Sequence, residues 1–341
     1  MTPPEVRRGL DGLLQSAWYG RSVLAWLLSP LALLFGLGVA CRHFAYRAGL
    51  LRTHRPGVPV IVVGNITVGG TGKTPVVAWL VEVCRGAGMN PGIVSRGYGG
   101  QAAAEPRMVS RDDDPSSVGD EPLLLRRQTG APVCVHADRV AAARRLAREG
   151  VDVVIADDGL QHYRLHRDLE IAVLDGERRL GNGFLLPAGP LREPAARLRE
   201  VDFVLVNGGR ARDGEVAVGT RAGMLRSLDG RAETSLAALA GQRVRAVAGI
   251  GNPGRFHTQL EEAGLHVEPV PVADHGKVDL AALSRASAVP IVMTEKDAVK
   301  YRAADAACPV WVAGLEVTVP ATVAAAILGR LAGARQGQGN D

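Results

Sequence analysis

The feature that most constrains this chain is a glycine-rich loop placed between an apolar strand and a helix. Residues 60–75 read VIVVGNITVGGTGKTP. The apolar run at 58–63 predicts a buried strand, and residues 74–86 predict a helix. In such a layout, backbone N–H groups and the N-terminus of the helix converge on anionic oxygens. The sequence therefore predicts an α/β fold built around a phosphate-binding loop, or P-loop.

Each position of this loop has a chemical role in holding a nucleotide. The predicted binding residues form one run: Gly69, Gly70, Thr71, Gly72, Lys73 and Thr74. Lys73 would reach the β- and γ-phosphates, and the hydroxyl of Thr74 would ligate Mg²⁺. The usual pattern GxxxxGK[ST] requires glycine at position 67, where this chain has threonine. We expect Gly69 and Gly70 to supply the flexibility instead.

A second motif complements the loop. Residues 151–161 read VDVVIADDGLQ, a buried strand that ends in Asp157 and Asp158. P-loop enzymes use acids at such a strand end to hold Mg²⁺ and to position the attacking group. An Asp-Asp-Gly turn is also common on protein surfaces, but the upstream P-loop favours the magnesium role.

Apolar runs without polar alternation, separated by helical stretches, predict a parallel sheet covered on both faces. The large unit has further strands at 92–95, 133–136, 171–174 and 203–206 and a helix at 139–149. A smaller α/β unit has strands at 244–250, 266–272 and 290–293 and a helix at 255–263. We predict an N-terminal anchor and basic linker (1–56), a P-loop kinase domain (57–206), a connecting segment (207–240) and a smaller α/β domain (241–341).

The N-terminus carries a membrane-type signal. Residues 22–41 contain no charge and are long enough to cross a bilayer as one helix. Basic residues flank this stretch, mainly on its C-terminal side, which places the body of the protein in the cytoplasm. Pro30 also permits a kinked helix that lies in one leaflet. A buried core helix is the alternative without a membrane.

Composition narrows the functional classes. The formal net charge is +5, which suits an anionic partner without identifying it. Aromatic residues make up only 4%, which disfavours stacking platforms for nucleic acid. The four scattered cysteines have neither disulfide nor zinc spacing. Of the 40 basic residues only four are lysines, at positions 73, 277, 296 and 300.

Two motifs favour other functions. Residues 249–254 satisfy the dinucleotide pattern GxGxxG. Asp274 follows about 20 positions later, the sequence spacing of the acid that binds the ribose in dinucleotide enzymes. An NAD-dependent oxidoreductase is therefore one alternative. Residues 294–297 (TEKD) are similar to the guanine-reading element of GTPases, but the lysine is one position late. A membrane-bound GTPase is the other alternative.

Eight motifs in order identify a family. The sequence resembles the tetraacyldisaccharide 4'-kinases, the lipid A 4'-kinases of Gram-negative bacteria, from the N-terminal apolar segment almost to the tail. The motifs are VGNITVGGTGKTP (63–75), SRGYGG (95–100), VGDEP (118–122), DDGLQH (157–162), GNGFLLPAGPLREP (181–194), GIGNPGRF (249–256), ADH (273–275) and TEKDAVK (294–300).

The resemblance implies that ATP phosphorylates the 4'-hydroxyl of a lipid-linked glucosamine disaccharide at the cytoplasmic face of the inner membrane. It implies that Asp120 and His275 together deprotonate that hydroxyl, with Lys73 also catalytic. It places Glu121, Asp157 and Asp158 beside Mg²⁺, with Thr74 as a further ligand. The implied partners are the lipid substrate and the membrane, with no nucleic acid and no obligatory protein partner.

Overall fold

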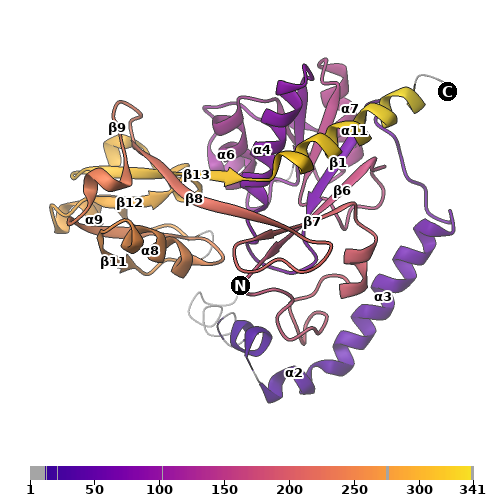
Figure 1. Cartoon of the computed structure of the whole chain (residues 1–341), viewed down its shortest axis with the longest axis horizontal. Coiled ribbons are helices and arrows are strands. Elements are labelled where there is room, and N and C mark those ends of the chain that lie inside the picture. Colours follow the sequence, from indigo (N-terminus) through magenta and orange to yellow (C-terminus); the bar gives the residue numbers. More distant parts are fainter. Residues whose placement is uncertain (1–11, 13, 21, 102, 274–275, 339–341) are drawn as a thin grey trace.

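The computed structural model of the 341-residue chain describes residues 12, 14–20, 22–101, 103–273 and 276–338. Within these residues the strands follow one continuous, mostly parallel sheet with helices on its faces (Figure 1). The mixed α/β class predicted from the sequence is confirmed. The sheet has two helix-covered ends, which we call the large lobe and the small lobe.

The large lobe contains the P-loop. Its strands lie in the order β7-β6-β1-β5-β2-β4-β3, and every pair is parallel except β3 with β4. The strands are β1 (Val60–Gly64), β2 (Pro91–Ser95), β3 (Arg107–Met108), β4 (Val133–Val135), β5 (Val153–Asp157), β6 (Leu169–Asp175) and β7 (Phe203–Asn207). The helices are α4 (Lys73–Gly86), α5 (Pro115–Val118), α6 (Asp120–Thr129), α7 (Arg139–Arg148) and the 3₁₀ turn η1 (Ala195–Arg199).

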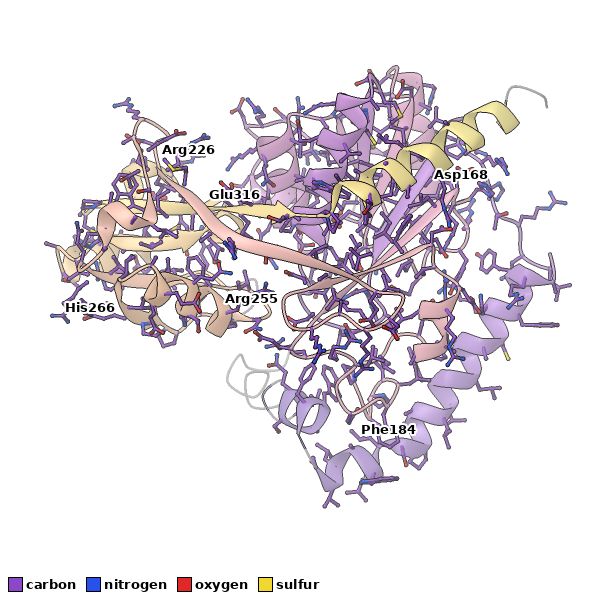
Figure 2. All side chains as sticks on the ribbon, viewed as in Figure 1. Asp168, Phe184, Arg226, Arg255, His266 and Glu316 are labelled. Atoms are coloured by element: carbon purple, nitrogen blue, oxygen red, sulfur yellow. The ribbon has the colours of Figure 1, made fainter. Side chains whose placement is uncertain are left out.

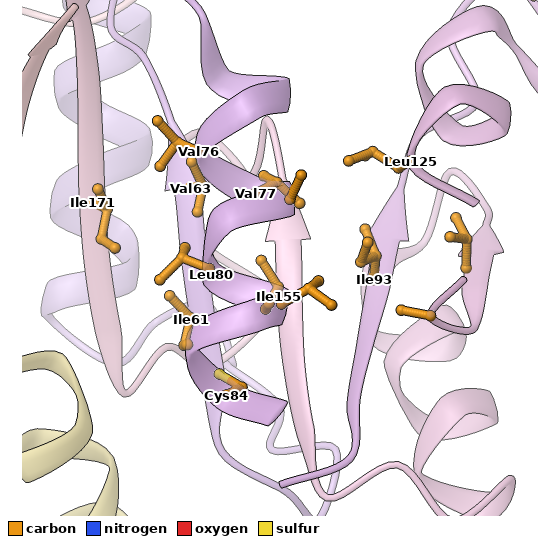
Figure 3. Packing of buried hydrophobic residues seen from close by; sticks show 14 of the residues in the cluster. Ile61, Val63, Val76, Val77, Leu80, Cys84, Ile93, Leu125, Ile155 and Ile171 are labelled. Carbon is orange, nitrogen blue, oxygen red and sulfur yellow. The ribbon is translucent and has the colours of Figure 1, made fainter. Parts of the chain in front are cut away.

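The large lobe has a hydrophobic cluster on each face of its sheet. Ile61 and Val63 of β1 belong to one cluster, which α4 covers with residues that include Leu80 (Figure 3). Val60 and Val62 belong to the cluster on the other face. Because both faces are buried, β1 has no polar alternation, as the sequence indicated.

The small lobe repeats this design on a reduced scale. Its strands β10, β11 and β12 are parallel and pack with their own buried clusters. The elements are β9 (Glu233–Thr234), η2 (Leu236–Leu239), β10 (Arg243–Val247), α8 (Pro253–Glu262), β11 (His266–Val270), α9 (Leu280–Ala286), β12 (Ile291–Thr294), α10 (Glu295–Ala298) and η3 (Ala303–Asp305). Figure 1 shows this lobe at the far end of two long strands.

Those two strands, β8 (Val216–Ser227) and β13 (Val310–Thr318), join the lobes. The first residues of β8 pair in parallel with β7, and the remainder pairs antiparallel with β13. The predicted connecting segment at 207–240 therefore contains a 12-residue strand.

The chain then returns to the large lobe. α11 (Ala321–Gln338) contributes Val323, Ile327 and Leu331 to the large-lobe cluster that α4 covers. The predicted boundaries, with one domain at 57–206 and another at 241–341, stay a prediction. The packing of α11 places the last part of the second range on the large lobe.

The N-terminal apolar stretch forms two helices. Leu28 separates α2 (Val23–Leu27) from α3 (Ser29–Arg47), and Pro30 lies in the first turn of α3. Proline has no N–H to continue the preceding helix, so the apolar stretch is interrupted at Leu28, in line with the kinked form that Pro30 permits. In the described part of the chain, no helix combines the length and the apolar character needed to cross a bilayer. Both helices expose large apolar side chains: Val23, Trp26, Leu27, Leu31, Leu33, Leu34 and Leu37.

Candidate active site

The P-loop lies at the carboxyl end of β1 and opens into α4. Gly72 caps α4 with a φ of 88°, and Gly69 has a φ of 96°, both in the left-handed region that favours glycine. Lys73 is therefore the first residue of the helix. The first-turn N–H groups of α4 and its partial positive charge face the loop, which suits a phosphate group.

A buried asparagine orients Lys73. The ammonium of Lys73 donates to Oδ1 of Asn65 at 3.3 Å and lies 3.5 Å from Oδ1 of Asp158. Arg192 holds the same carboxylate with two hydrogen bonds of 2.9 and 3.0 Å. Arg192 also donates to the backbone oxygen of Asn65 at 2.9 Å. Two cations and one carboxylate thus meet beside the P-loop.

The two adjacent aspartates differ in their electrostatics. Burial and the neighbouring Glu121 raise the pKa of Asp157 to about 7. Burial also opposes ionisation of Asp158, but Lys73 and Arg192 outweigh it and lower the pKa of Asp158 to about 2. Asp158 therefore carries its charge at neutral pH because two cations stabilise it.

Asp157 has an uncommitted oxygen. The hydroxyl of Ser95 donates to Oδ2 of Asp157 at 3.3 Å, whereas Oδ1 is buried without a hydrogen-bond partner. A buried carboxylate oxygen without a partner is costly unless a further group binds it. A cation with oxygen preference fits this position. Among the described residues, no three His, Cys, Asp or Glu side chains converge enough to hold a metal ion by themselves.

The small lobe closes over the P-loop. A Cβ at Gly70 would lie 3.3 Å from the backbone N of Gly251, so the two glycine-rich loops approach closely. Arg255 donates from α8 to the backbone oxygen of Asn207 at 3.1 Å, where the lobes meet (Figure 2). The resulting cleft is lined by residues from both lobes, among them Gly70, Thr71, Gly72, Lys73, Thr74, Glu121, Leu124, Ile250, Asn252, Phe256, Lys296 and Leu315.

The predicted acids at 120 and 121 lie at the start of α6. Asp120 is 3.7 Å from the ammonium of Lys300, and Glu121 is 3.3 Å from that of Lys296. Both lysines belong to the small lobe, so these ion pairs cross between the lobes. Glu121 lines the same cleft as Lys73. The predicted catalytic His275 and the neighbouring Asp274 lie outside the described residues.

The GxGxxG motif at 249–254 and the TEKD motif at 294–297, which suggested an oxidoreductase or a GTPase, have structural roles here. Asp297 is buried, and its carboxylate accepts from the backbone N of Gly249 at 2.8 Å and from Lys300 at 3.0 Å. A side chain engaged in this way does not face a guanine base. The GxGxxG loop that Asp297 supports lies against the P-loop, at Gly70.

The structure adds site residues that the sequence reasoning did not single out. Asn65 and Arg192 contact Lys73 and Asp158, and Asn207 donates to the backbone oxygen of Thr71 at 3.2 Å. Asn65 directly follows β1, and Asn207 is the last residue of β7. Arg192 lies inside the GNGFLLPAGPLREP motif at 181–194. A polar residue directly after a buried parallel strand was the available signal for Asn65 and Asn207.

Gly72 provides a test of the loop geometry. A Cβ at Gly72 would collide with the side-chain amide of Asn207, which Thr71 and Thr220 hold in place. Gly69 has a similar φ but open space around it. Both alanine variants carry a left-handed backbone cost of ~1–2 kcal/mol. We expect Gly72→Ala to raise the dissociation constant for the nucleotide at least about tenfold more than Gly69→Ala does. Titration calorimetry measures both constants. Equal losses would contradict this packing.

Comparison with known proteins places this site in a family. A family model described as tetraacyldisaccharide-1-P 4'-kinase matches residues 24–332. The tetraacyldisaccharide 4'-kinase of Nitrosococcus oceani is 45% identical over 322 residues, which cover 94% of this chain and 95% of that protein. That of Tolumonas auensis is 49% identical over 293 residues, which cover 85% and 89%.

A solved structure agrees with the sequence relatives. LpxK from Aquifex aeolicus, in complex with ATP, is 28% identical, with a TM-score of 0.76 over 91% of this chain and all of that one. Both the sequence match and the fold match extend over both lobes. The chain belongs to the tetraacyldisaccharide 4'-kinase family.

Proposed function

We propose that the cleft between the lobes transfers the γ-phosphoryl group of ATP to the 4'-hydroxyl of a tetraacylated glucosamine disaccharide 1-phosphate, a step of lipid A biosynthesis. The observation that carries this proposal is the P-loop lysine held by Asn65 and Asp158 within the cleft. The run Gly69, Gly70, Thr71, Gly72, Lys73 and Thr74 would cradle the phosphates. Apolar side chains that line the same cleft, such as Phe256 and Leu315, suit the adenine ring.

Magnesium would bind between the phosphates and the acids of the large lobe. Mg²⁺ commonly takes one or two carboxylates and completes its shell with substrate phosphates and water. The unpartnered Oδ1 of Asp157 makes this residue the best protein ligand, with Thr74, Glu121 and Asp158 as the other candidates. When bound, the ion would neutralise charge that develops on the transferring group.

Asp120 and His275 would activate the acceptor. A sugar hydroxyl is a poor nucleophile, and a positioned carboxylate–imidazole pair removes its proton during transfer. Asp120 lies in the first turn of α6, where its carboxylate is 3.7 Å from the ammonium of Lys300. His275 belongs to the ADH motif at 273–275, and its role here rests on the family resemblance.

The N-terminal helices would hold the enzyme on the inner membrane, with the catalytic body on the cytoplasmic face. α2 and α3 expose a series of leucines together with Trp26, and such an apolar face binds in the interfacial region of a bilayer. Basic residues at positions 42, 47, 52 and 55 follow this face and suit anionic headgroups. A surface-bound enzyme would meet its lipid acceptor at high effective concentration.

Replacing Lys73 tests the kinase assignment. Lys73→Ala removes the cation that reaches the transferring phosphate, so kcat/KM with ATP and the lipid disaccharide should fall to less than about a tenth, a loss above ~1.4 kcal/mol. The thermal unfolding midpoint serves as the control for folding. A variant that keeps more activity than this would argue against a P-loop mechanism.

The general-base pair makes a sharper prediction. Asp120→Ala and His275→Ala should each slow the chemical step by ~10²–10⁴, the scale of a positioned base. Because the two residues act as a unit, the double variant should be little slower than the slower single variant. ATP affinity should stay near that of the wild type, because the P-loop holds the phosphates. Multiplicative losses in single-turnover assays would mean that the residues act separately.

The membrane proposal is tested on the exposed face of α3. Leu33 and Leu37 are 76% and 62% exposed, so acidic residues there should not disturb the core. Burial of each leucine in the bilayer is worth ~1.5–3 kcal/mol. The double variant Leu33→Asp/Leu37→Asp should therefore float with anionic vesicles at least about tenfold less than the wild type. Met224→Asp, at a half-exposed site on β8, is the control and should float normally. Unchanged flotation of the α3 variant would reject this surface.

A further inference from the structure

The helix that carries the apolar face also touches the loop after β5. Arg42 of α3 donates from Nη2 to the backbone oxygen of Gln161 at 3.1 Å. Two further residues of α3, His43 and Tyr46, stack against Tyr163 with ring centroids 5.3 and 5.7 Å away. α3 is therefore seated directly on residues 161–163.

The surface beneath α3 is itself fixed to the body of the enzyme. The hydroxyl of Tyr163 donates to Oε1 of the buried Glu193 at 2.6 Å. The guanidinium of Arg167 lies 4.7 Å from the centre of the Tyr163 ring. With its hydroxyl and ring both held, Tyr163 offers α3 a firm support. Gln161, two residues before Tyr163, therefore lies next to a side chain that is fixed on both sides.

Gln161 carries the contact on to the P-loop. Its side-chain amide donates to the backbone oxygen of Asn65 at 3.1 Å. Asn65 in turn accepts the hydrogen bond from Lys73 at 3.3 Å. Two residues, Gln161 and Asn65, therefore separate Arg42 on α3 from the P-loop lysine.

A second path joins the N-terminal segment to the same part of the P-loop. The indole of Trp18 donates to the backbone oxygen of Pro187 at 2.9 Å, and Trp26 packs edge-on against Phe184, labelled beside the N-terminal helices in Figure 2. The loop that contains Phe184 then bonds the P-loop, through Val68 N to Pro190 O at 2.8 Å and Arg192 N to Ile66 O at 2.7 Å. Both paths end at residues 65–68.

We propose that Arg42 is a positioning residue for phosphoryl transfer. By holding the carbonyl of Gln161, it fixes the side chain that supports Asn65, and thereby the position of Lys73. The inference rests on the P-loop site proposed above. Its consequence is that correct seating of the membrane-facing helices on the body completes the catalytic geometry, so those helices act on turnover as well as on attachment.

Arg47 supplies a matched control. It lies on the same helix, is exposed and carries the same charge, but it pairs with Glu200 at 3.7 Å. Arg42→Met and Arg47→Met remove one positive charge each and keep an unbranched side chain. Membrane attraction should therefore change equally in the two variants, whereas only Arg42→Met breaks the link to Gln161.

The experiment measures both steady-state constants with full-length protein in detergent micelles that carry the lipid disaccharide. We expect Arg42→Met to lower kcat about five- to tenfold, the scale of one lost hydrogen bond of ordinary net strength, with KM for the acceptor close to that of wild type. Arg47→Met removes one headgroup-facing charge without touching Gln161, so its kcat should stay at least about threefold above that of Arg42→Met. Arg42→Lys, which can still donate to the same carbonyl, should recover part of kcat. A normal kcat for Arg42→Met, or an equal loss in Arg47→Met, overturns the proposal.

Amide hydrogen exchange tests the coupling without activity. Arg42→Met should speed exchange in residues 65–69 and in the loop at 158–163, and Arg47→Met should change neither segment. Unchanged exchange at 65–69 in Arg42→Met overturns the inference even if the wild-type protein does not phosphorylate the disaccharide. Absence of wild-type turnover, by contrast, rejects the proposed function. The two failures are therefore distinguishable.

Discussion

The arrangement of the site depends on the hydrogen bonds of one buried residue, Asn65. Its backbone oxygen accepts from Gln161 and Arg192, and its side-chain oxygen accepts from Lys73 and Arg192. Its amide also donates to the backbone oxygen of Gly69 at 3.3 Å. Three segments distant in sequence, the P-loop, the loop after β5 and the loop before η1, thus share one anchor. Because Asn65 is fully buried, water does not replace these partners when one is lost.

The two adjacent aspartates, Asp157 and Asp158, have opposite pKa shifts. Asp158 is held by two cations and stays ionised, so it fixes Lys73 and Arg192 before any ligand arrives. Asp157 is buried, its Oδ1 has no hydrogen-bond partner, and burial together with Glu121 raises its pKa. A single Asp-Asp sequence therefore provides both a structural carboxylate and a candidate metal ligand. The difference arises from which side chains face each residue.

Local patterns in the sequence predicted much of the large lobe. β1, α4 and β5 are continuous apolar or helical stretches buried by tertiary packing, so their sequence and their environment agree. β8 was not predicted because Gly219 and Gly223 interrupt its apolar residues and weaken the local strand signal. Its strand conformation comes from pairing with β13, which lies about 90 positions later, and no local signal encodes that contact.

Site residues that lie within one local motif could be predicted from the sequence. Contacts that the fold makes between distant segments could not. Lys73 and Thr74 follow directly from the P-loop pattern. Arg192 meets Asp158 only because a long loop turns back along the P-loop, where Leu191 bridges to Thr67. The contact of Arg42 with Gln161 likewise requires α3 to pack against the body. Such contacts depend on tertiary structure, so sequence patterns alone do not reveal them.

The return of α11 to the large lobe has a consequence for how this protein is made. The hydrophobic cluster around β1 and α4 includes Val323, Ile327 and Leu331, close to the end of the chain. A ribosome releases these residues only after the whole small lobe has been synthesised. The large lobe therefore keeps an exposed apolar face until α11 has left the ribosome. Loss of α11 alone would leave that face uncovered while every other element of both lobes is present.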